Sequence, residues 1–343
     1  MSRVTYTIAL DVMGGDHGRS VVMPAARAAL GAMRDIRLLL VGDEVAIQPH
    51  LQQWSDTETR RVEVVHTTQV VGMDELPAMA MRNKKDSSMR RVIELVKQGQ
   101  ADACVSAGNT GALMATARYV LKTLPGIDRP AIATALPSLR GHTHVLDLGA
   151  NVGVEPIHLY QFAVMGSILV TAIDGLEQPR VGLLNIGSEA IKGNDQVREA
   201  ATLLENSPLN YIGFVEGNDI YCGEVDVVVC DGFIGNVALK SSEGVARMIV
   251  DNMRAEFKRS WISQLRGLVA LPVLNRLRER IDPRRYNGAS LLGLQGIVIK
   301  SHGSADAMSF HNAIRIARKE AEAKVPQRID KLIGRLLQHE GQA

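Results

Sequence analysis

Six short segments of this chain share a pattern that could hold an anion. In each of them an apolar run ends in a glycine-containing turn that also carries a short polar side chain. The six turns are residues 11–16 (DVMGGD), 106–111 (SAGNTG), 147–151 (DLGAN), 185–189 (NIGSE), 231–236 (DGFIGN) and 301–304 (SHGS). Glycine lets backbone N–H groups approach a ligand, and a helix that follows such a turn attracts negative charge at its first turn. One such turn is an ordinary helix cap; six of them predict a binding cleft.

The turns fit a small oxyanion better than a nucleotide. The segment GGDHG at 14–18 lacks the GxGxxG spacing of a dinucleotide-binding turn. The segment GSEAIKGN at 187–194 lacks the Gly-Lys-Ser/Thr ending of a P-loop. A ligand of the size of phosphate is therefore the better interpretation.

Basic side chains follow several of these turns. Lys192, Lys240 and Lys300 each lie within a few residues of one and together could neutralise a phosphate, although a single such lysine is more often a solvated surface charge. His17 and His302 are the histidines best placed for acid–base chemistry, because both lie inside candidate ligand turns. Two other histidines, at 142 and 144, are expected only to pack or to face solvent.

Short aliphatic runs alternate with longer helical patterns along the whole chain. The predicted strands are residues 6–12, 37–42, 62–66, 102–107, 132–136, 144–149, 180–187, 211–216, 226–231 and 296–301, and the predicted helices are 19–34, 86–98, 155–172, 193–206, 235–260 and 304–322. This alternation is typical of an α/β protein with a doubly wound, mostly parallel sheet of the Rossmann-like α/β/α type. Because ligands bind at the carboxyl ends of parallel strands, we expect the six turns to meet at one sheet edge.

Composition places the chain among soluble globular proteins. It has 343 residues with 46% hydrophobic and 22% charged side chains, and no linker divides it, so we expect a single catalytic domain over 1–343. A net charge of +2 does not favour nucleic acid as a partner. Three cysteines without metal-site spacing suit a reducing cytosol, and no apolar run approaches the ~20 residues of a membrane span.

The segment 250–290 is predicted to form an inserted helical hairpin. Its centre, GLVALPVL at 267–274, is apolar and flanked by arginines. We interpret this centre as the tip of the hairpin, with Leu268, Val269, Leu271 and Val273 contacting anionic lipid. Core packing or dimerisation would account for the same apolar residues.

Taken together, the motifs resemble those of the bacterial acyl-ACP:phosphate acyltransferases, a family related to the phosphotransacetylases. The matching segments run in order from residue 6 to about 322 and are DVMGGD (11–16), SAGNTGA (106–112), LDLGAN (146–151), LLNIGSEAIKGN (183–194), EGNDI (216–220), VDVVVCDGFIGN (225–236), YNGASLLGL (286–294) and KSHGSAD (300–306). The combination is far more specific than any one of them.

This resemblance implies an enzyme that uses inorganic phosphate to cleave the thioester of a long-chain acyl-acyl carrier protein. The product would be an acyl phosphate, which a membrane glycerol-3-phosphate acyltransferase uses in phospholipid synthesis. The family is similarly expected to be a homodimer with no metal or other cofactor, cytoplasmic and peripherally associated with the inner face of the cell membrane.

The implied roles fall on named residues of the turns. We expect phosphate to bind Gly14, Gly15, Asp16, Gly108, Asn109, Thr110, Gly111 and Lys192. His302, Ser301 or Asn236 would polarise the thioester oxygen, with Asp231 orienting its neighbours. In the wider group the residue at the position of His302 is usually arginine, so this chain departs from the pattern there.

Two alternatives remain open at this point. A phosphotransacetylase that uses coenzyme A would need the same anion site and differ in its acyl donor. A non-catalytic regulator that binds phosphate or lipid would bind these ligands without turnover.

Overall fold

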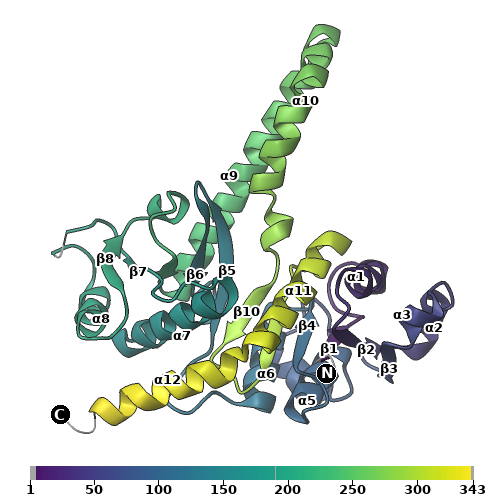
Figure 1. Ribbon diagram of the computed structural model, residues 1–343, viewed down its shortest axis with the longest axis horizontal. Helices are drawn as coiled ribbons and strands as arrows, with labels where there is room; N and C mark the ends of the chain where they lie inside the picture. The colour runs from purple at the N-terminus through teal and green to yellow at the C-terminus, as the bar shows by residue number, and fades with distance from the viewer. Residues whose placement is uncertain (1–4, 190, 341–343) are drawn as a thin grey trace.

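The computed structural model describes residues 5–189 and 191–340. Its strands form one sheet in the order β3-β2-β1-β4-β11-β10-β5-β6-β9-β7-β8 (Figure 1). The strands are β1 (Tyr6–Asp11), β2 (Ile36–Gly42), β3 (Val62–His66), β4 (Ala103–Ser106), β5 (Ala131–Ser138), β6 (Gly141–Leu146), β7 (Val181–Leu184), β8 (Tyr211–Val215), β9 (Val227–Val229), β10 (Ala289–Leu292) and β11 (Ile297–Lys300). Each predicted strand is present within a few residues; β10 was not predicted.

Helices cover both faces of the sheet. They are α1 (Arg19–Ala32), α2 (Glu44–Leu51), α3 (Asp56–Thr59), α4 (Pro77–Asn83), α5 (Ser88–Lys97), α6 (Thr110–Leu121), α7 (Pro156–Asp174), α8 (Asp195–Glu205), α9 (Gly232–Lys258), α10 (Trp261–Ile281), α11 (Ala307–Ala323) and α12 (Val325–Glu340), with short 3₁₀ helices η1 (Asp219–Tyr221) and η2 (Pro283–Tyr286). The predicted α/β architecture is confirmed.

The core follows from the alternation of side chains along each strand. In β1, Ile8 and Leu10 face α1 and α11, whereas Ala9 faces α5 and α6 on the other side. In β6, Leu146 packs toward α7 and Val145 toward the opposite face. Apolar side chains on both faces are what a sheet covered by helices requires.

Two blocks of strands run in opposite directions. Strands β1, β2, β3, β4 and β11 are parallel to one another, and so are β6, β7, β8 and β9. Between the blocks, the pairings β11–β10, β10–β5 and β5–β6 are antiparallel. Three reversals place the carboxyl ends of the two blocks at opposite edges of the sheet. The prediction that all six turns meet at one edge is therefore wrong, because the extra strand β10 reverses the direction.

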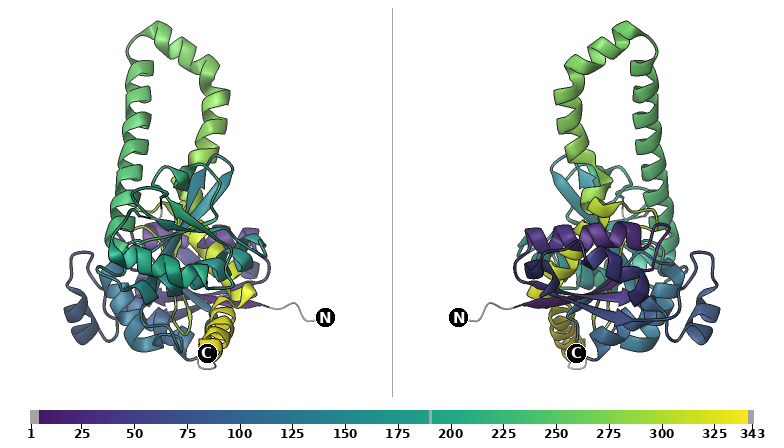
Figure 2. Two further views of the ribbon diagram at one scale, coloured as in Figure 1. Left: turned by 90° about the vertical axis from the view of Figure 1, so that its left-hand side faces the viewer. Right: turned by 90° about the vertical axis from the view of Figure 1, so that its right-hand side faces the viewer.

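Helices α9 and α10 form a hairpin that projects from the body of the molecule, beside the β5–β6 hairpin (Figures 1 and 2). The chain turns at Arg259 and Ser260, where the Ser260 side chain caps α10. Pro272, which we expected near the tip, lies inside α10, and that helix bends part-way along (Figure 2). The segment GLVALPVL is thus part of a helix rather than the tip.

Helix α7 is the one helix of the described residues whose length and hydropathy would suit a membrane span. It has 19 residues, and 67% of its most apolar stretch is buried within the molecule. It packs against β6, α8 and α12 through side chains that include Leu146, Leu204 and Ile329. This burial is what the central helix of a folded core shows.

Candidate functional site

The six turns form two clusters at opposite ends of the central strands. The Ser301 cluster comprises residues 11–18, 106–111 and 301–304, which follow the parallel strands β1, β4 and β11. The Asn236 cluster comprises residues 147–151, 185–192 and 231–236, which follow β6, β7 and β9. Central strands such as β10 and β11 have four residues each, so the two edges are only about 13 Å apart at this point.

A buried carboxylate organises the Ser301 cluster. Asp11, at the end of β1, is 1% exposed and accepts a hydrogen bond from Ser106 Oγ at 2.6 Å. Burial raises the pKa of Asp11, and the Ser106 hydroxyl opposes this shift. Ser106 Oγ in turn accepts the N–H of Gly108 at 3.1 Å. A Cβ on Gly14 would lie 2.4 Å from Asp11 Oδ2, so the close approach of this carboxylate requires glycine there.

The first and third turns of the cluster are joined through their backbones. The N–H of Asp16 donates to the carbonyl of Gly303 at 2.9 Å. Gly15 has a φ of 89°, and a Cβ on it would lie 3.0 Å from that same carbonyl oxygen. Gly14, His17, Ala107 and Gly303 line one narrow crevice. Three turns from distant parts of the sequence thus surround one point.

Several groups predicted to bind phosphate serve the fold instead. The N–H groups of Gly108 and Asp16 are engaged as described, and Asn109 caps α6 by accepting the N–H of Ala112 at 2.9 Å. The amide of Asn109 also donates to the carbonyl of Met73. These polar groups form hydrogen bonds that stabilise the turns themselves.

Other N–H groups of the same turns remain open. The N–H groups of Gly15, Thr110 and Gly111 have no acceptor among residues 5–189 and 191–340. Thr110 and Gly111 are exposed at the first turn of α6. They are the backbone donors that can meet an anion.

Lys300 brings a buried positive charge to the Ser301 cluster. This side chain is 8% exposed, and its Nζ donates to the carbonyls of Ala107 and Ser301. Burial lowers the pKa of Lys300 to about 8; the charges of Asp11 and Asp16 oppose that shift. An ammonium group with so little solvent is a strong partner for an oxyanion.

His302 is held in one tautomer. Its Nδ1 accepts the N–H of Ser304 at 3.2 Å and lies 2.9 Å from Ser304 Oγ. Nε2 therefore carries the proton of the neutral ring. Burial and then the charge of Lys240 lower the pKa of His302 below its ordinary value. An exposed, neutral imidazole with a free N–H can donate to a substrate oxygen.

Ser301, predicted to polarise the thioester, has a different position. It is 0% exposed, and its Oγ accepts a hydrogen bond from Asn287 Nδ2 at 2.8 Å. The Oδ1 of Asn287 accepts the N–H of His302 at 3.0 Å. In this geometry Ser301 and Asn287 orient His302 and do not face substrate. Asn287 lies in the motif at 286–294, but its role was not predicted.

The inner part of the Asn236 cluster is structural. Asp147 is 0% exposed and accepts the N–H groups of Ile132, Ala150 and Asn151. Asp231 caps α9 by accepting the N–H of Phe233 at 2.8 Å, and its other oxygen accepts the N–H of Gly153. Asp231 orients backbone, as a cap does.

Asn236 and Lys192 form the outer part of the Asn236 cluster. Asn236 is exposed, and its side chain lies against Gly149 of the neighbouring turn. The Lys192 side chain is 44% exposed and pairs with Glu189 at 2.8 Å. β7 and β9 are adjacent strands, which places the two loops side by side. An amide and a cation are therefore available to a ligand here.

Helix α9 connects the two clusters. Asp231 is its N-cap, Asn236 lies in its first turns, and Lys240 follows Asn236 by one helical turn on the same face. Like-charge repulsion from Lys240 contributes, after burial, to the lowered pKa values of Lys300 and His302. Lys240 is therefore near the Ser301 cluster, and one extended substrate can contact both clusters along α9.

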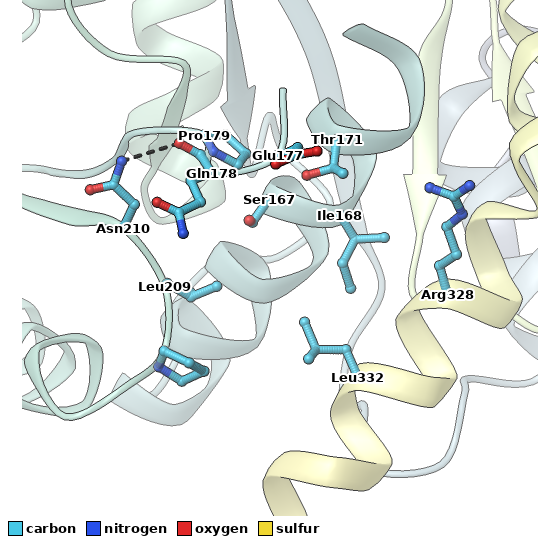
Figure 3. Close-up of a pocket in the computed structure, with 11 residues that line it drawn as sticks. Ser167, Ile168, Thr171, Glu177, Gln178, Pro179, Leu209, Asn210, Arg328 and Leu332 are labelled. Atoms are coloured by element: carbon cyan, nitrogen blue, oxygen red, sulfur yellow. Dashed lines mark hydrogen bonds between the residues drawn. The ribbon is translucent and has the colours of Figure 1, made fainter. Parts of the chain in front are cut away.

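A separate cavity of about 290 Å³ lies between α7, α12 and the loops before β7 and β8 (Figure 3). Ser167, Ile168 and Leu332 are among its lining residues, and Asn210 Nδ2 donates to the carbonyl of Gln178 across it. It contains none of the residues predicted to bind or react. We therefore do not assign the reaction to this cavity on the basis of its volume.

Sequence comparison identifies close relatives. A family model described as a fatty acid synthesis protein matches residues 6–328. A phosphate acyltransferase of Alkalilimnicola ehrlichii is 62% identical over 97% of both chains. One of Methylococcus capsulatus is 63% identical over 94% of this chain and 95% of the relative.

Solved structures show the same fold. A phosphotransacetylase from Streptococcus pyogenes has a TM-score of 0.61 at 17% identity, covering 92% of this chain and 94% of the other. A branched-chain phosphotransacylase from Enterococcus faecalis has a TM-score of 0.55 at 13% identity, covering 92% and 99%. At these identities the likeness establishes the fold alone. The close relatives and the family model show that this chain belongs to the phosphate acyltransferase family of enzymes.

Proposed function

We propose that this enzyme transfers a long-chain acyl group from acyl-acyl carrier protein to inorganic phosphate. The observation that carries the proposal is the Ser301 cluster, which holds buried Lys300, the neutral ring of His302 and open backbone N–H groups on three neighbouring turns. The acyl phosphate then passes to a membrane glycerol-3-phosphate acyltransferase. Kinship with phosphate acyltransferases supports phosphate as the acceptor.

The reaction needs positioning and charge stabilisation more than a protein nucleophile. A phosphate oxygen attacks the thioester carbonyl carbon, the C–O bond forms, the C–S bond breaks, and the carrier leaves as a thiolate that takes up a proton. In the proposed mechanism Lys300 and the N–H groups of Gly15 and Thr110 hold the phosphate. Nε2–H of His302 donates to the carbonyl oxygen as it gains charge.

The Asn236 cluster receives the other end of the substrate complex. The amide of Asn236 faces the same side of α9 as Lys240, so it can donate to the thioester oxygen or to phosphate. The turns of this cluster also carry exposed apolar side chains, among them Phe233 at 62%, Ile186 at 80% and Ile191 at 84%. Such a surface can bind an acyl chain, because removal of apolar surface from water is favourable.

The acyl donor separates this proposal from the two alternatives. Purified protein is incubated with palmitoyl-acyl carrier protein, with and without phosphate, and free carrier and acyl phosphate are measured. We expect release only with phosphate, and slower reaction with palmitoyl-coenzyme A. Faster reaction with coenzyme A would favour the phosphotransacetylase alternative, and ligand binding without release would favour a regulator.

The projecting hairpin is the proposed membrane contact, which would make the enzyme a cytoplasmic protein peripherally bound to the inner face of the cell membrane. At its turn Trp261 is 72% and Ile262 45% exposed, next to Lys258 and Arg259. Apolar side chains with adjacent cations suit an anionic lipid surface.

Of the residues first predicted for this contact, three are exposed further down α10. Val269 is 80%, Leu271 43% and Val273 63% exposed; the side chain of Leu268 lies outside the described part of the structure. We propose Trp261 as the better anchor, because it lies at the turn of the hairpin.

Flotation with anionic liposomes tests this contact. Trp261→Glu and Leu271→Glu should each weaken binding, with the larger loss for Trp261→Glu, and leave turnover of soluble substrate unchanged. Val45→Glu is the matched control, since Val45 is 80% exposed on α2. Binding equal to the control would count against insertion.

A homodimer is the remaining part of the proposal. Only Gly232 and Gly235 of α9 are buried in this chain, while Val245, Met248 and Ile249 are each at least half exposed. An apolar helix face of this length favours a partner helix. Light scattering should give twice the chain mass for the wild type and a lower mass for Met248→Glu.

A further inference from the structure

Two histidines and an aspartate that the proposed reaction does not use meet beside the β5–β6 hairpin. His142 and His144 lie at i and i+2 of β6, so their rings project from the same face of the sheet. Asp174 is the last residue of α7. Its Oδ2 lies 2.9 Å from Nε2 of His142 and 2.9 Å from Nε2 of His144. Our expectation that these histidines only pack or face solvent is therefore wrong.

We propose that His142, His144 and Asp174 bind a Zn²⁺ ion. One ligand atom from each lies within 4.8 Å of the others. Imidazole nitrogen and carboxylate oxygen are zinc ligands, and three protein ligands with a water in the fourth position are a common arrangement. Around a tetrahedral Zn²⁺ ligand atoms are about 3.3 Å apart, so the two 2.9 Å contacts with Asp174 need to open by a few tenths of an ångström, and the third pair of ligand atoms lies within 4.8 Å.

The charges around Asp174 suit a cation. Asp226 lies near enough to Asp174 to interact with its charge and adds negative potential, although Arg180 pairs with Asp226. Two imidazole nitrogens already contact one oxygen of Asp174, so the three side chains are placed to share a cation.

Packing alone does not explain the histidines. His144 is 7% exposed, and its Nδ1 is buried with no hydrogen-bond partner among the described residues. An unsatisfied buried polar atom destabilises the fold, and an apolar side chain at this position would avoid that cost. A metal would engage Nε2 and not Nδ1, so the reason for an imidazole here is the convergence of both histidine Nε2 atoms on Oδ2 of Asp174.

The position of the site gives it a structural role. The ring of His142 lies 6.0 Å from that of Tyr286, at the end of η2, which connects the projecting hairpin to β10. The next residue, Asn287, holds Ser301 and His302. Zn²⁺ would join the end of α7 to β6 close to this segment.

Zinc titration of the full-length, chelator-treated protein tests the site. A competing chromophoric chelator measures affinity for wild type, Asp174→Asn and His142→Gln; each variant removes one of three ligands and keeps a similar shape. We expect one Zn²⁺ per chain for wild type and at least about tenfold weaker binding for both variants. His50→Gln and Cys222→Ser, which alter other half-buried zinc-binding side chains, should bind as wild type does.

Cobalt gives a second measurement. Co²⁺-loaded wild type should show visible ligand-field bands without a sulfur charge-transfer band, and His142→Gln should lose them. Zn²⁺ should also raise the unfolding temperature of wild type more than that of Asp174→Asn. Equal zinc affinity in wild type and both variants would overturn the proposal, whatever the acyl-transfer activity.

Discussion

The Ser301 and Asn236 clusters are built from the same residue types at strand ends, but the two clusters differ in which polar groups are available to a ligand. In the Ser301 cluster a lysine is buried with its pKa lowered to about 8, and backbone N–H groups remain open around it. In the Asn236 cluster the buried group is Asp147, whose hydrogen bonds are all to the fold, and the available groups are exposed.

This difference shows that a buried cation, and not the turn pattern that the two clusters share, distinguishes the candidate binding site from the framework here. A buried cation has lost solvent and gains most from a bound anion, whereas an exposed lysine such as Lys192 is screened by water and salt. We therefore expect the Ser301 cluster to make the larger contribution to catalysis. In the Asn236 cluster, Asp147 should stabilise the fold, and the exposed Asn236 and Lys192 should contribute modestly to ligand binding.

The largest effect is predicted for Asp147→Ala. The change leaves the N–H groups of Ile132, Ala150 and Asn151 without their buried acceptor. We expect a loss of at least about 3 kcal/mol in the free energy of unfolding, measured by urea denaturation. Asp231→Ala, which removes a more exposed helix cap, should cost only about 1 kcal/mol. Equal losses would refute the larger stabilising role that we assign to the buried carboxylate of Asp147.

Next in size is Lys300→Met. Replacing the ammonium with an apolar chain of similar length removes the buried charge that we assign to phosphate. The expected drop in kcat is about 10²–10³-fold, as for loss of one oxyanion-stabilising donor, with folding intact by circular dichroism. Lys331→Met, on exposed α12, is the control. Near-normal turnover by Lys300→Met would move the reaction away from the Ser301 cluster.

The same lysine predicts a pH dependence of stability. Its pKa falls from 10.5 to about 8 on folding, so between these values the unfolded chain binds more protons than the folded one. Stability due to Lys300 must then rise as pH increases from 8 to 10.5, by on the order of 3 kcal/mol at most. Unfolding free energies of wild type and Lys300→Met at pH 7 and 10 measure this; a constant difference would argue against a shifted pKa.

Most of the fold follows from local pattern. Buried runs such as 37–42 and 226–231 identify strands because both faces are covered by helices. Strand β10 was not predicted, because it has only four residues and no helix separates it from β11. That one strand determines the relative direction of the two blocks, and strand direction cannot be predicted from the local hydrophobic pattern.

The sequence predicted the turns that make up the candidate site, but not which of their polar groups bind one another. Glycine and short polar residues identified the turns, and Lys300 and His302 were singled out by their neighbours. Which N–H groups stay open depends on contacts between distant segments, such as Asp16 with Gly303 and Asn287 with Ser301. Those pairings arise only when the strands are arranged in space.

The smallest effect, for Lys192→Ala, tests the outer Asn236 cluster. Lys192 is exposed and already paired with Glu189 at 2.8 Å, so its loss should raise the KM for phosphate by no more than about fivefold and leave kcat nearly unchanged. The difference should shrink as salt is added, because an exposed charge is screened; Lys331→Ala serves as control. An unchanged KM would remove Lys192 from the phosphate site. A fall in kcat instead would show that this cluster acts in the transition state, and the two clusters would then share the chemistry across α9.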